Sequence, residues 1–157
     1  MNSLKVIEKL LFMSNETWKK HGNPASVFSR LLVFPLLILT IWWRETLAEF
    51  FWVIFIVLLV FLFLSTRLFP APKNNKSWAS KSILGEKLWL DNTNCQVPQK
   101  HSYAATLIIS GQFISLLLIV LGLVYTVQSM VWTGTSTFLV LKLWFLDRMV
   151  WLLSDMS

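Results

Sequence analysis

Four side chains in this sequence have the types that acid–base chemistry on a phosphate-bearing molecule requires: His21, Glu86, Asp147 and Arg148. A histidine beside a carboxylate is the usual general base, and an arginine can hold a phosphate through paired hydrogen bonds. Lys87 would hold the same phosphate as a point charge. These residues are far apart in the sequence, so such chemistry depends on a fold that gathers them at one surface. Catalysis on a lipid headgroup is therefore one hypothesis for this chain.

A structural explanation of the same residues is equally consistent with the sequence. Arg148 and Lys142 would extend to a membrane surface, Asp147 would pair with a neighbouring base, Glu86 would be solvated, and His21 would cap a helix end. On an ideal helix Lys142, Asp147 and Arg148 point in different directions, so they form no polar stripe. This spacing disfavours an ion or proton path along that helix.

Motifs for cofactors and metals are absent from the sequence. None of the five glycines lies in a phosphate-binding loop or a dinucleotide fingerprint, and no HExxH string or cysteine cluster indicates zinc. The single cysteine, Cys95, excludes an internal disulfide. His21 and His101 would have to converge to hold a haem, and their expected positions near helix ends suit an embedded porphyrin poorly. The sequence therefore predicts neither a cofactor nor a metal.

The net charge of +6 is spread thinly along the chain rather than concentrated in one tract. A nucleic-acid-binding surface needs a dense basic patch, so no nucleic acid partner is expected. Basic residues beside apolar segments instead attract anionic lipid headgroups, and each gains about 1 kcal/mol near such a surface. Membrane lipids are the expected partners.

Apolar residues dominate the composition. They make up 55% of the 157 residues and charged residues 14%, against about 45–50% and about 25% in soluble domains. They form two long blocks, 27–64 and 103–153, and since a membrane helix needs about 20 residues, each block accommodates two. The predicted fold class is all-α, a single polytopic membrane domain over residues 1–157 whose four transmembrane helices form two hairpins. The predicted spans are residues 27–43, 46–64, 103–126 and 130–147.

Two residues mark the entrance of the first predicted span. Ser26 is expected to cap this helix, because serine accepts hydrogen bonds from free backbone N–H groups. Arg30 lies about one turn inside the span, where a charge is costly. Its side chain is therefore expected to extend back to the lipid headgroups.

The beginning of the last helix has two alternatives. It starts either near Met130 or near Phe138, the latter with residues 126–137 in a loop. The later start pushes Asp147 towards the middle of the membrane, so the earlier start is favoured. Residues 133–137 are then helical, and their small polar side chains let helices approach closely.

Two further segments have the character of interfacial helices. Residues 4–20 form an amphipathic pattern, and residues 78–90 form a weaker one within a cytoplasmic loop that spans residues 65–102. Gly85 weakens the helical pattern of the second segment. Tryptophans and basic residues are typical anchors at a membrane interface. The candidate contacts to lipid or partner are Lys87, Lys142, Trp78 and Trp89.

The basic residues predict the orientation of the chain. Thirteen of the fourteen lysines and arginines can be placed on one side of a membrane, and Arg44, in the short turn between the first two spans, lies on the other. The positive-inside tendency makes the basic side cytoplasmic. We therefore expect a multi-pass protein of the inner (plasma) membrane with both termini in the cytoplasm.

Three strings carry a resemblance to a known family: HGNPASVFSR (21–30), RLFPAPKNNKSWASKSILGEKLWL (67–90) and KLWFLDRMVWL (142–152). They resemble an uncharacterised family of small prokaryotic integral membrane proteins, and the likeness covers nearly the whole chain. The resemblance implies a prokaryotic inner-membrane protein. It implies no activity and assigns no functional residue.

Three functional hypotheses follow. The leading one is a non-enzymatic membrane protein that binds lipid or a partner, the partner being a second copy of the chain or another membrane protein. The alternative is a membrane-embedded enzyme that acts on a lipid headgroup at the cytoplasmic interface. A small oligomeric transporter is third, because the spans offer few polar residues for a path. The sequence does not identify a substrate or an oligomeric state.

Overall fold

The computed structural model of the protein describes residues 15–91 and 97–156. All regular secondary structure within these ranges is helical, so the predicted all-α fold class is confirmed for this part of the chain. Residues 4–14 of the predicted amphipathic helix, and Cys95, lie outside the described residues. The helices are α2 (Asn15–His21), α3 (Pro24–Trp42), α4 (Arg44–Leu47), α5 (Phe50–Leu68), α6 (Trp78–Leu90), α7 (Gln99–Val124) and α8 (Gln128–Met156).

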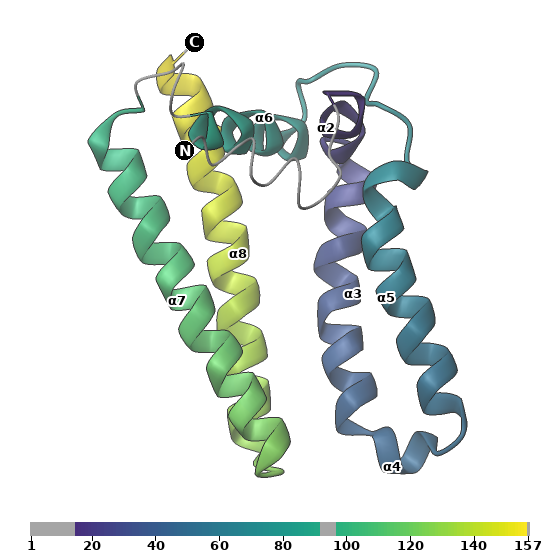
Figure 1. The fold of residues 1–157 in the computed structure, drawn as a ribbon. Helices are drawn as coiled ribbons and strands as arrows, with labels where there is room; N and C mark the ends of the chain where they lie inside the picture. The colour runs from purple at the N-terminus through teal and green to yellow at the C-terminus, as the bar shows by residue number, and fades with distance from the viewer. Residues whose placement is uncertain (1–14, 92–96, 157) are drawn as a thin grey trace.

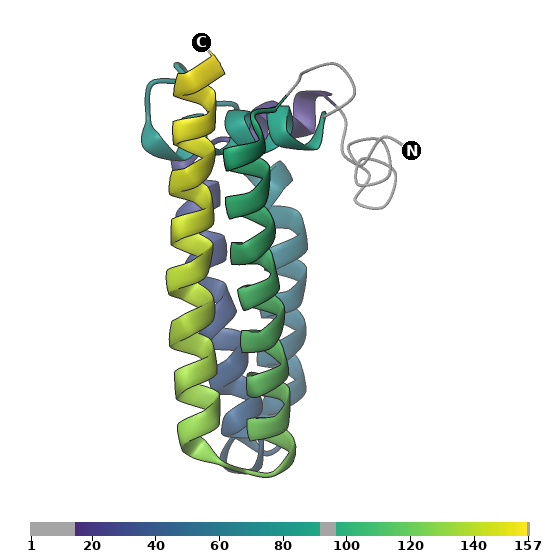
Figure 2. The same ribbon diagram turned by 90° about the vertical axis from the view of Figure 1, so that its left-hand side faces the viewer.

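Four long helices lie side by side as two pairs, α3 with α5 and α7 with α8 (Figure 1). The short helix α6 lies across one end of these pairs, and α2 lies beside it at the same end (Figures 1 and 2). The opposite end holds α4 and the turn between α7 and α8. The molecule therefore has two unlike ends.

Three of the described helices are long and apolar enough to cross a membrane: α3, α5 and α7. The fourth predicted span corresponds to α8, which is not among them. α8 begins at Gln128, so the alternative that placed residues 126–137 in a loop is wrong. Four membrane crossings remain a prediction.

Small residues let α7 and α8 pack closely. A Cβ atom added to Gly134 would lie 2.8 Å from Cγ1 of Ile119 and 3.0 Å from the Ser115 carbonyl oxygen. A side chain at this position would force Ile119 and the backbone of α7 to move, so glycine allows the close crossing. Thr135 is buried beside it and donates its hydroxyl to the Val131 carbonyl at 2.7 Å. The close approach predicted for residues 133–137 is thus seen at Gly134.

Polar contacts join the beginning of α3 to the end of α5 and to the segment that follows α5. The N-cap of α3 is Asn23, whose side chain accepts from the Ala25 N–H at 2.9 Å and donates to the Pro70 carbonyl at 2.8 Å. The prediction that Ser26 caps this helix is wrong. Ser26 is instead buried inside α3 and donates to the Ser65 carbonyl of α5 at 2.9 Å, because α3 already begins at Pro24.

The contact of α6 with α8 is a backbone contact. A Cβ atom on Gly85 would lie only 2.0 Å from the Met149 carbonyl oxygen. Near one end of α6, the Trp78 indole N–H donates to the Asp147 carboxylate at 3.0 Å. The helix has the bounds expected from the sequence, residues 78–90. Gly85, which weakens the helical pattern, is the residue that lets α6 lie against α8.

Candidate functional site

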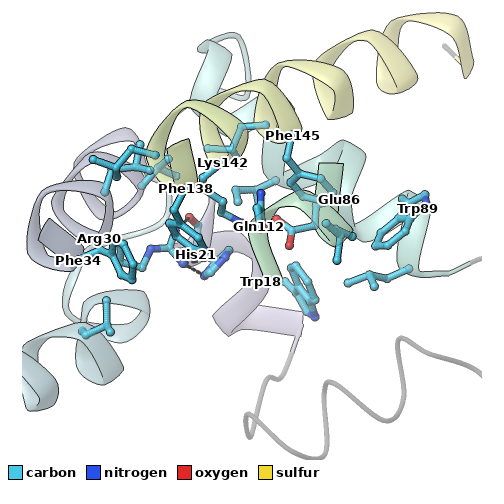
Figure 3. Close-up of a pocket in the computed structure, with 18 residues that line it drawn as sticks. Trp18, His21, Arg30, Phe34, Glu86, Trp89, Gln112, Phe138, Lys142 and Phe145 are labelled. Carbon is cyan, nitrogen blue, oxygen red and sulfur yellow. Dashed lines mark hydrogen bonds between the residues drawn. The ribbon is translucent and has the colours of Figure 1, made fainter. Parts of the chain in front are cut away.

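A cavity of about 510 Å³ lies where the two helix pairs meet α2 and α6. Its walls come from α2, α3, α5, α6, α7 and α8, and most of the lining side chains are aliphatic or aromatic (Figure 3). The volume is within the range of about 300–1,000 Å³ that is typical of small-molecule sites. The polar side chains in the lining are His21, Arg30, Glu86, Gln112 and Lys142.

The guanidinium of Arg30 turns back along α3 and is held by protein groups. Its Nε donates to the Ser26 carbonyl at 3.0 Å, and its Nη2 donates to the His21 carbonyl at 3.3 Å. Nη1 lies 2.6 Å from Nδ1 of the His21 ring. Arg30 was expected to reach the lipid headgroups at the entrance of its span. Instead it lines the cavity beside His21 (Figure 3).

These surroundings keep His21 neutral. Burial lowers the pKa of His21 from 6.5 to about 2, and the positive charges of Arg30 and then Lys142 add to this effect. A neutral imidazole can accept a hydrogen bond from the guanidinium. However, a base with so low a pKa does not take up a proton near pH 7. The lowered pKa of His21 therefore disfavours the general-base role that the sequence suggested for this residue.

Three polar groups in the cavity have no hydrogen-bond or ion-pair partner within the part of the chain that the structure describes. Nε2 of Gln112 is buried without a partner. No basic nitrogen of the described residues lies within 4.0 Å of the Glu86 carboxylate. The Lys142 ammonium lies 4.9 Å from the Phe145 ring centre and makes no ion pair among the described residues. Partly buried polar groups without partners are costly, and a bound ligand would satisfy them.

Aromatic rings form much of the cavity wall. Phe34 of α3 stacks on Phe138 of α8 with ring centres 4.3 Å apart, which joins the two helix pairs. Trp89 of α6 meets Phe145 edge to face at 5.9 Å. Trp18 of α2 is buried, with 5% of its surface exposed. Such walls suit the apolar part of an amphiphile, while the polar groups suit its headgroup.

The structure brings together only some of the residues that the sequence singled out. His21, Glu86, Lys142 and Trp89 line one cavity, although they belong to three helices. The other candidates do not line it. Asp147 is exposed and accepts the Trp78 indole N–H, Arg148 is half-buried with an unpartnered Nε among the described residues, and Lys87 is half-buried on α6.

Sequence reasoning missed three residues of the site: Arg30, Gln112 and Trp18. Arg30 and Gln112 did carry a signal, because a cation or an amide within an apolar span must find a partner or a function. The position of Arg30 near the end of its span suggested the lipid headgroups as its partner. Gln112 is a single polar residue in an almost wholly apolar stretch. Trp18 gave no signal of its own, since its place on an amphipathic face is equally typical of membrane contact.

A second polar cluster joins the beginning of α7 to the end of α8. Nε2 of the buried His101 lies 2.9 Å from the Asp155 carboxylate, and the Lys100 ammonium lies 2.6 Å from the same oxygen. Hydrogen bonds from Lys100 and then His101 lower the pKa of Asp155 from 3.8 to about 2. This cluster is separate from the cavity and holds two helix ends together.

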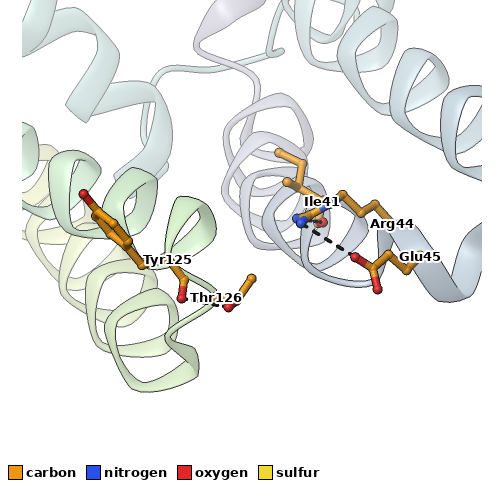
Figure 4. Close-up of polar contacts among 5 residues, drawn as sticks. All are labelled: Ile41, Arg44, Glu45, Tyr125 and Thr126. Carbon is orange, nitrogen blue, oxygen red and sulfur yellow. Dashed lines mark hydrogen bonds and ion pairs between the residues drawn. The ribbon is translucent and has the colours of Figure 1, made fainter.

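The other end of the molecule has a simpler set of polar contacts (Figure 4). An Nη atom of Arg44 lies 4.0 Å from the carboxylate of the neighbouring Glu45, and the two side chains are 41% and 90% exposed. In the turn before α8, Thr126 has a positive φ of 55° and donates its hydroxyl to the Tyr125 carbonyl at 2.7 Å.

Comparison with known proteins gives one match. Residues 5–157 match the model of a family described as "Family of unknown function (DUF6653)". No curated protein and no solved structure matches the chain.

Proposed function

The chain belongs to DUF6653, a family of unknown function, and from this premise we propose that it is a non-enzymatic membrane protein that binds a lipid phosphate in the cavity. One observation carries the proposal. Two cationic side chains, Arg30 and Lys142, line a cavity whose other walls are mainly aliphatic and aromatic. Cations among apolar walls match an amphiphile, whose phosphate needs charge and whose chains need apolar surface. The predicted membership of an uncharacterised family is confirmed, while a prokaryotic origin remains part of the proposal.

The proposal places the protein across a membrane with four crossings. α3, α5 and α7 have the length and apolarity to cross, and α8 packs along α7 between the same two ends (Figure 1). The 29 residues of α8 would extend over about 44 Å at 1.5 Å per residue, which exceeds the roughly 30 Å of a hydrocarbon core. The exposed aromatic and aliphatic side chains of α5 suit contact with lipid.

The distribution of charge supports an orientation. α2, α6 and the connection between α5 and α6 carry many of the basic residues, and all lie at the end that holds the cavity. Arg44 lies on α4 at the other end. By the positive-inside tendency the cavity end faces the cytoplasm, so both termini are cytoplasmic and the bound phosphate belongs to the inner leaflet.

Binding fits the geometry better than catalysis does. An enzyme acting on a lipid headgroup would need a general base beside the bound phosphate. His21 is neutral and holds the guanidinium of Arg30, and Asp147 and Arg148 are not among the lining residues of the cavity. Glu86 is the acidic residue in the lining. A transporter would need a continuous polar path, whereas the cavity continues into apolar packing between Phe34 and Phe138.

Native mass spectrometry of the full chain from mild detergent tests the proposal. Wild-type protein is expected to retain phospholipid. Arg30→Gln and Lys142→Gln each remove one charge-assisted contact of about 1.5–3 kcal/mol, so each should weaken lipid retention about tenfold or more. Lys81→Gln is the matched control, because Lys81 is exposed on α6 and does not line the cavity.

Folding of each variant is checked by its helical circular dichroism. A wild-type protein that retains no phospholipid would overturn the proposal. Equal retention by Lys142→Gln, Arg30→Gln and Lys81→Gln in folded protein would also overturn it, because the cavity cations would then contribute nothing to binding.

A further inference from the structure

We infer that the lipid bound in the cavity is zwitterionic, with a primary ammonium group received by Glu86 as well as a phosphate held by Arg30 and Lys142. A phosphoethanolamine headgroup has this chemistry. The inference rests on the proposed function, because it adds an ammonium group to the phosphate that the same cavity is proposed to bind. It follows from the opposed charges of the cavity lining rather than from its cations alone.

Cationic and anionic side chains line the cavity together, and the Lys142 ammonium lies beside Phe145, which packs against Trp89. Arg30 lies with Phe34 on one side, and Glu86 lies with Trp89 on the other (Figure 3). Arg30 comes from α3 and Glu86 from α6. No basic nitrogen within the described ranges of the chain lies within 4.0 Å of the Glu86 carboxylate. Among the described residues no cation therefore neutralises this carboxylate by direct contact, although the charge of Arg30 acts on it across the cavity.

A carboxylate in a half-buried position needs a partner. Glu86 is only partly exposed, and the buried Leu90 and Ile83 line the same cavity. Burial of a carboxylate without a hydrogen-bond donor is costly, and the cost is relieved by a cation in contact with it. An ammonium group on the ligand would supply both the charge and the N–H donors.

A purely anionic headgroup fits this lining less well. Its phosphate would be attracted by Arg30 and Lys142 but repelled by Glu86, which lines the same cavity. Between partly buried charges such repulsion is stronger than in bulk solvent. A zwitterionic headgroup avoids the conflict, because its phosphate can lie against Arg30 or Lys142 while its ammonium contacts Glu86.

Aromatic side chains favour a cation on the side of Glu86. Trp18 and Trp89 both lie on this side of the cavity (Figure 3). Indole faces attract ammonium groups through their π electrons. A primary ammonium also donates N–H bonds to a carboxylate, which a quaternary ammonium cannot do. The lining therefore favours ethanolamine over choline.

Titration of the full chain in mild detergent with three short-chain lipids tests the inference. Tryptophan fluorescence reports binding, because Trp18 and Trp89 line the cavity. Phosphatidylethanolamine is expected to bind about tenfold more tightly than phosphatidylglycerol or phosphatidylcholine. Glu86→Gln should abolish this preference and leave the binding of phosphatidylglycerol unchanged or tighter. Glu16→Gln, which neutralises an exposed carboxylate on α2, should keep the preference.

The possible results separate this inference from the proposed function. If phosphatidylglycerol binds as tightly as phosphatidylethanolamine to the wild-type chain, the zwitterionic ligand is overturned while phosphate binding stands. If Glu86→Gln keeps the wild-type preference, Glu86 is not the ammonium site and the inference fails. If none of the three lipids binds, the proposed function itself fails. The wild-type comparison needs no variant, so it decides the matter even if Glu86→Gln does not fold.

Discussion

Arg30 illustrates how a charge inside an apolar helix is accommodated. Its guanidinium bonds to the carbonyls of Ser26 and His21, so the protein supplies the polar surroundings that lipid cannot. This arrangement fixes the neighbouring imidazole in its neutral form, because burial and a nearby cation both oppose protonation. Arg30 and His21 therefore form one unit in which the histidine positions the cation. Lys142, without an ion pair among the described residues, is the second cation that faces the cavity.

The neutral state of His21 predicts that acid destabilises the protein. The folded pKa of about 2 is below the free value of 6.5, so between these values the unfolded chain binds a proton that the folded chain does not. The contribution is fully present above about pH 6.5 and decreases as pH falls, at about 1.4 kcal/mol per pH unit. From pH 6.5 to pH 5 the free energy of unfolding should decrease by about 2 kcal/mol.

Thermal unfolding in detergent from pH 7.5 to pH 5 measures this effect. Other charged groups face His21, namely Arg30, Lys142 and Glu86, so the comparison uses His21→Gln, which keeps a hydrogen-bond acceptor for Arg30 but does not titrate. This variant should lose less stability on acidification than wild type. Parallel curves for the two proteins would contradict the neutral state of His21.

The residues of the candidate site could be predicted from the sequence only in part. His21, Glu86 and Lys142 were selected by side-chain type, and the structure places them in one cavity. Asp147 and Arg148 were selected on the same grounds, but they follow Lys142 by five and six residues on one helix. At 100° per residue they point away from the side of α8 that Lys142 occupies. Side-chain type therefore selects candidates, whereas helix rotation decides which of them meet.

At the scale of the elements, the ends of a helix can be predicted from the residues next to them in the sequence, whereas the helix against which it packs cannot. The bounds of α6 follow from the Ser77 cap and its helical pattern. The contact of Gly85 with Met149 of α8 could not be predicted, because the partner is 64 residues away in the sequence. The same glycine that weakens the helix locally makes the close approach possible.

The crossing of α6 on α8 predicts a large effect of one methyl group. In the interior of an exposed helix, Gly→Ala stabilises by about 1 kcal/mol. Gly85→Ala should do the opposite, because the new Cβ would lie 2.0 Å from the Met149 carbonyl oxygen and α6 must move. Overpacking of this kind typically costs about 1–3 kcal/mol, and the displacement should also weaken the Trp78–Asp147 hydrogen bond.

Thermal unfolding of detergent-solubilised protein measures the change. Gly22→Ala is the matched control, because its Cβ would find its nearest neighbour at 3.5 Å, an ordinary contact distance. Gly85→Ala should unfold at a clearly lower temperature than Gly22→Ala. If Gly85→Ala were as stable as wild type, the close approach of α6 to α8 would be wrong.

At the scale of the whole molecule, many of the basic residues lie at the same end as the cavity. The basic residues of α2 and α6, the cavity and the C-terminal end of α8 all lie at one end, and Arg44 lies at the other (Figure 1). The sequence predicted this separation, because charge and hydropathy patterns depend on composition along the chain. It did not predict the cavity, which depends on side chains from six helices. A binding site at the basic end would be open to the cytoplasmic leaflet if the orientation is as proposed.

The proposed orientation predicts which ends of the molecule a membrane-impermeant maleimide can reach. Cys95, the single cysteine, falls in the sequence between α6 and α7, so the proposed orientation predicts it on the cytoplasmic side. It should resist the reagent in intact cells and react in permeabilised cells. Glu45 at the opposite end has a side chain that is 90% exposed. In a Cys95→Ser background, Glu45→Cys should therefore react in intact cells. Denatured protein provides the control for thiol reactivity. If Cys95 but not Glu45→Cys were labelled in intact cells, the proposed orientation would be wrong and the cavity would face the outer leaflet.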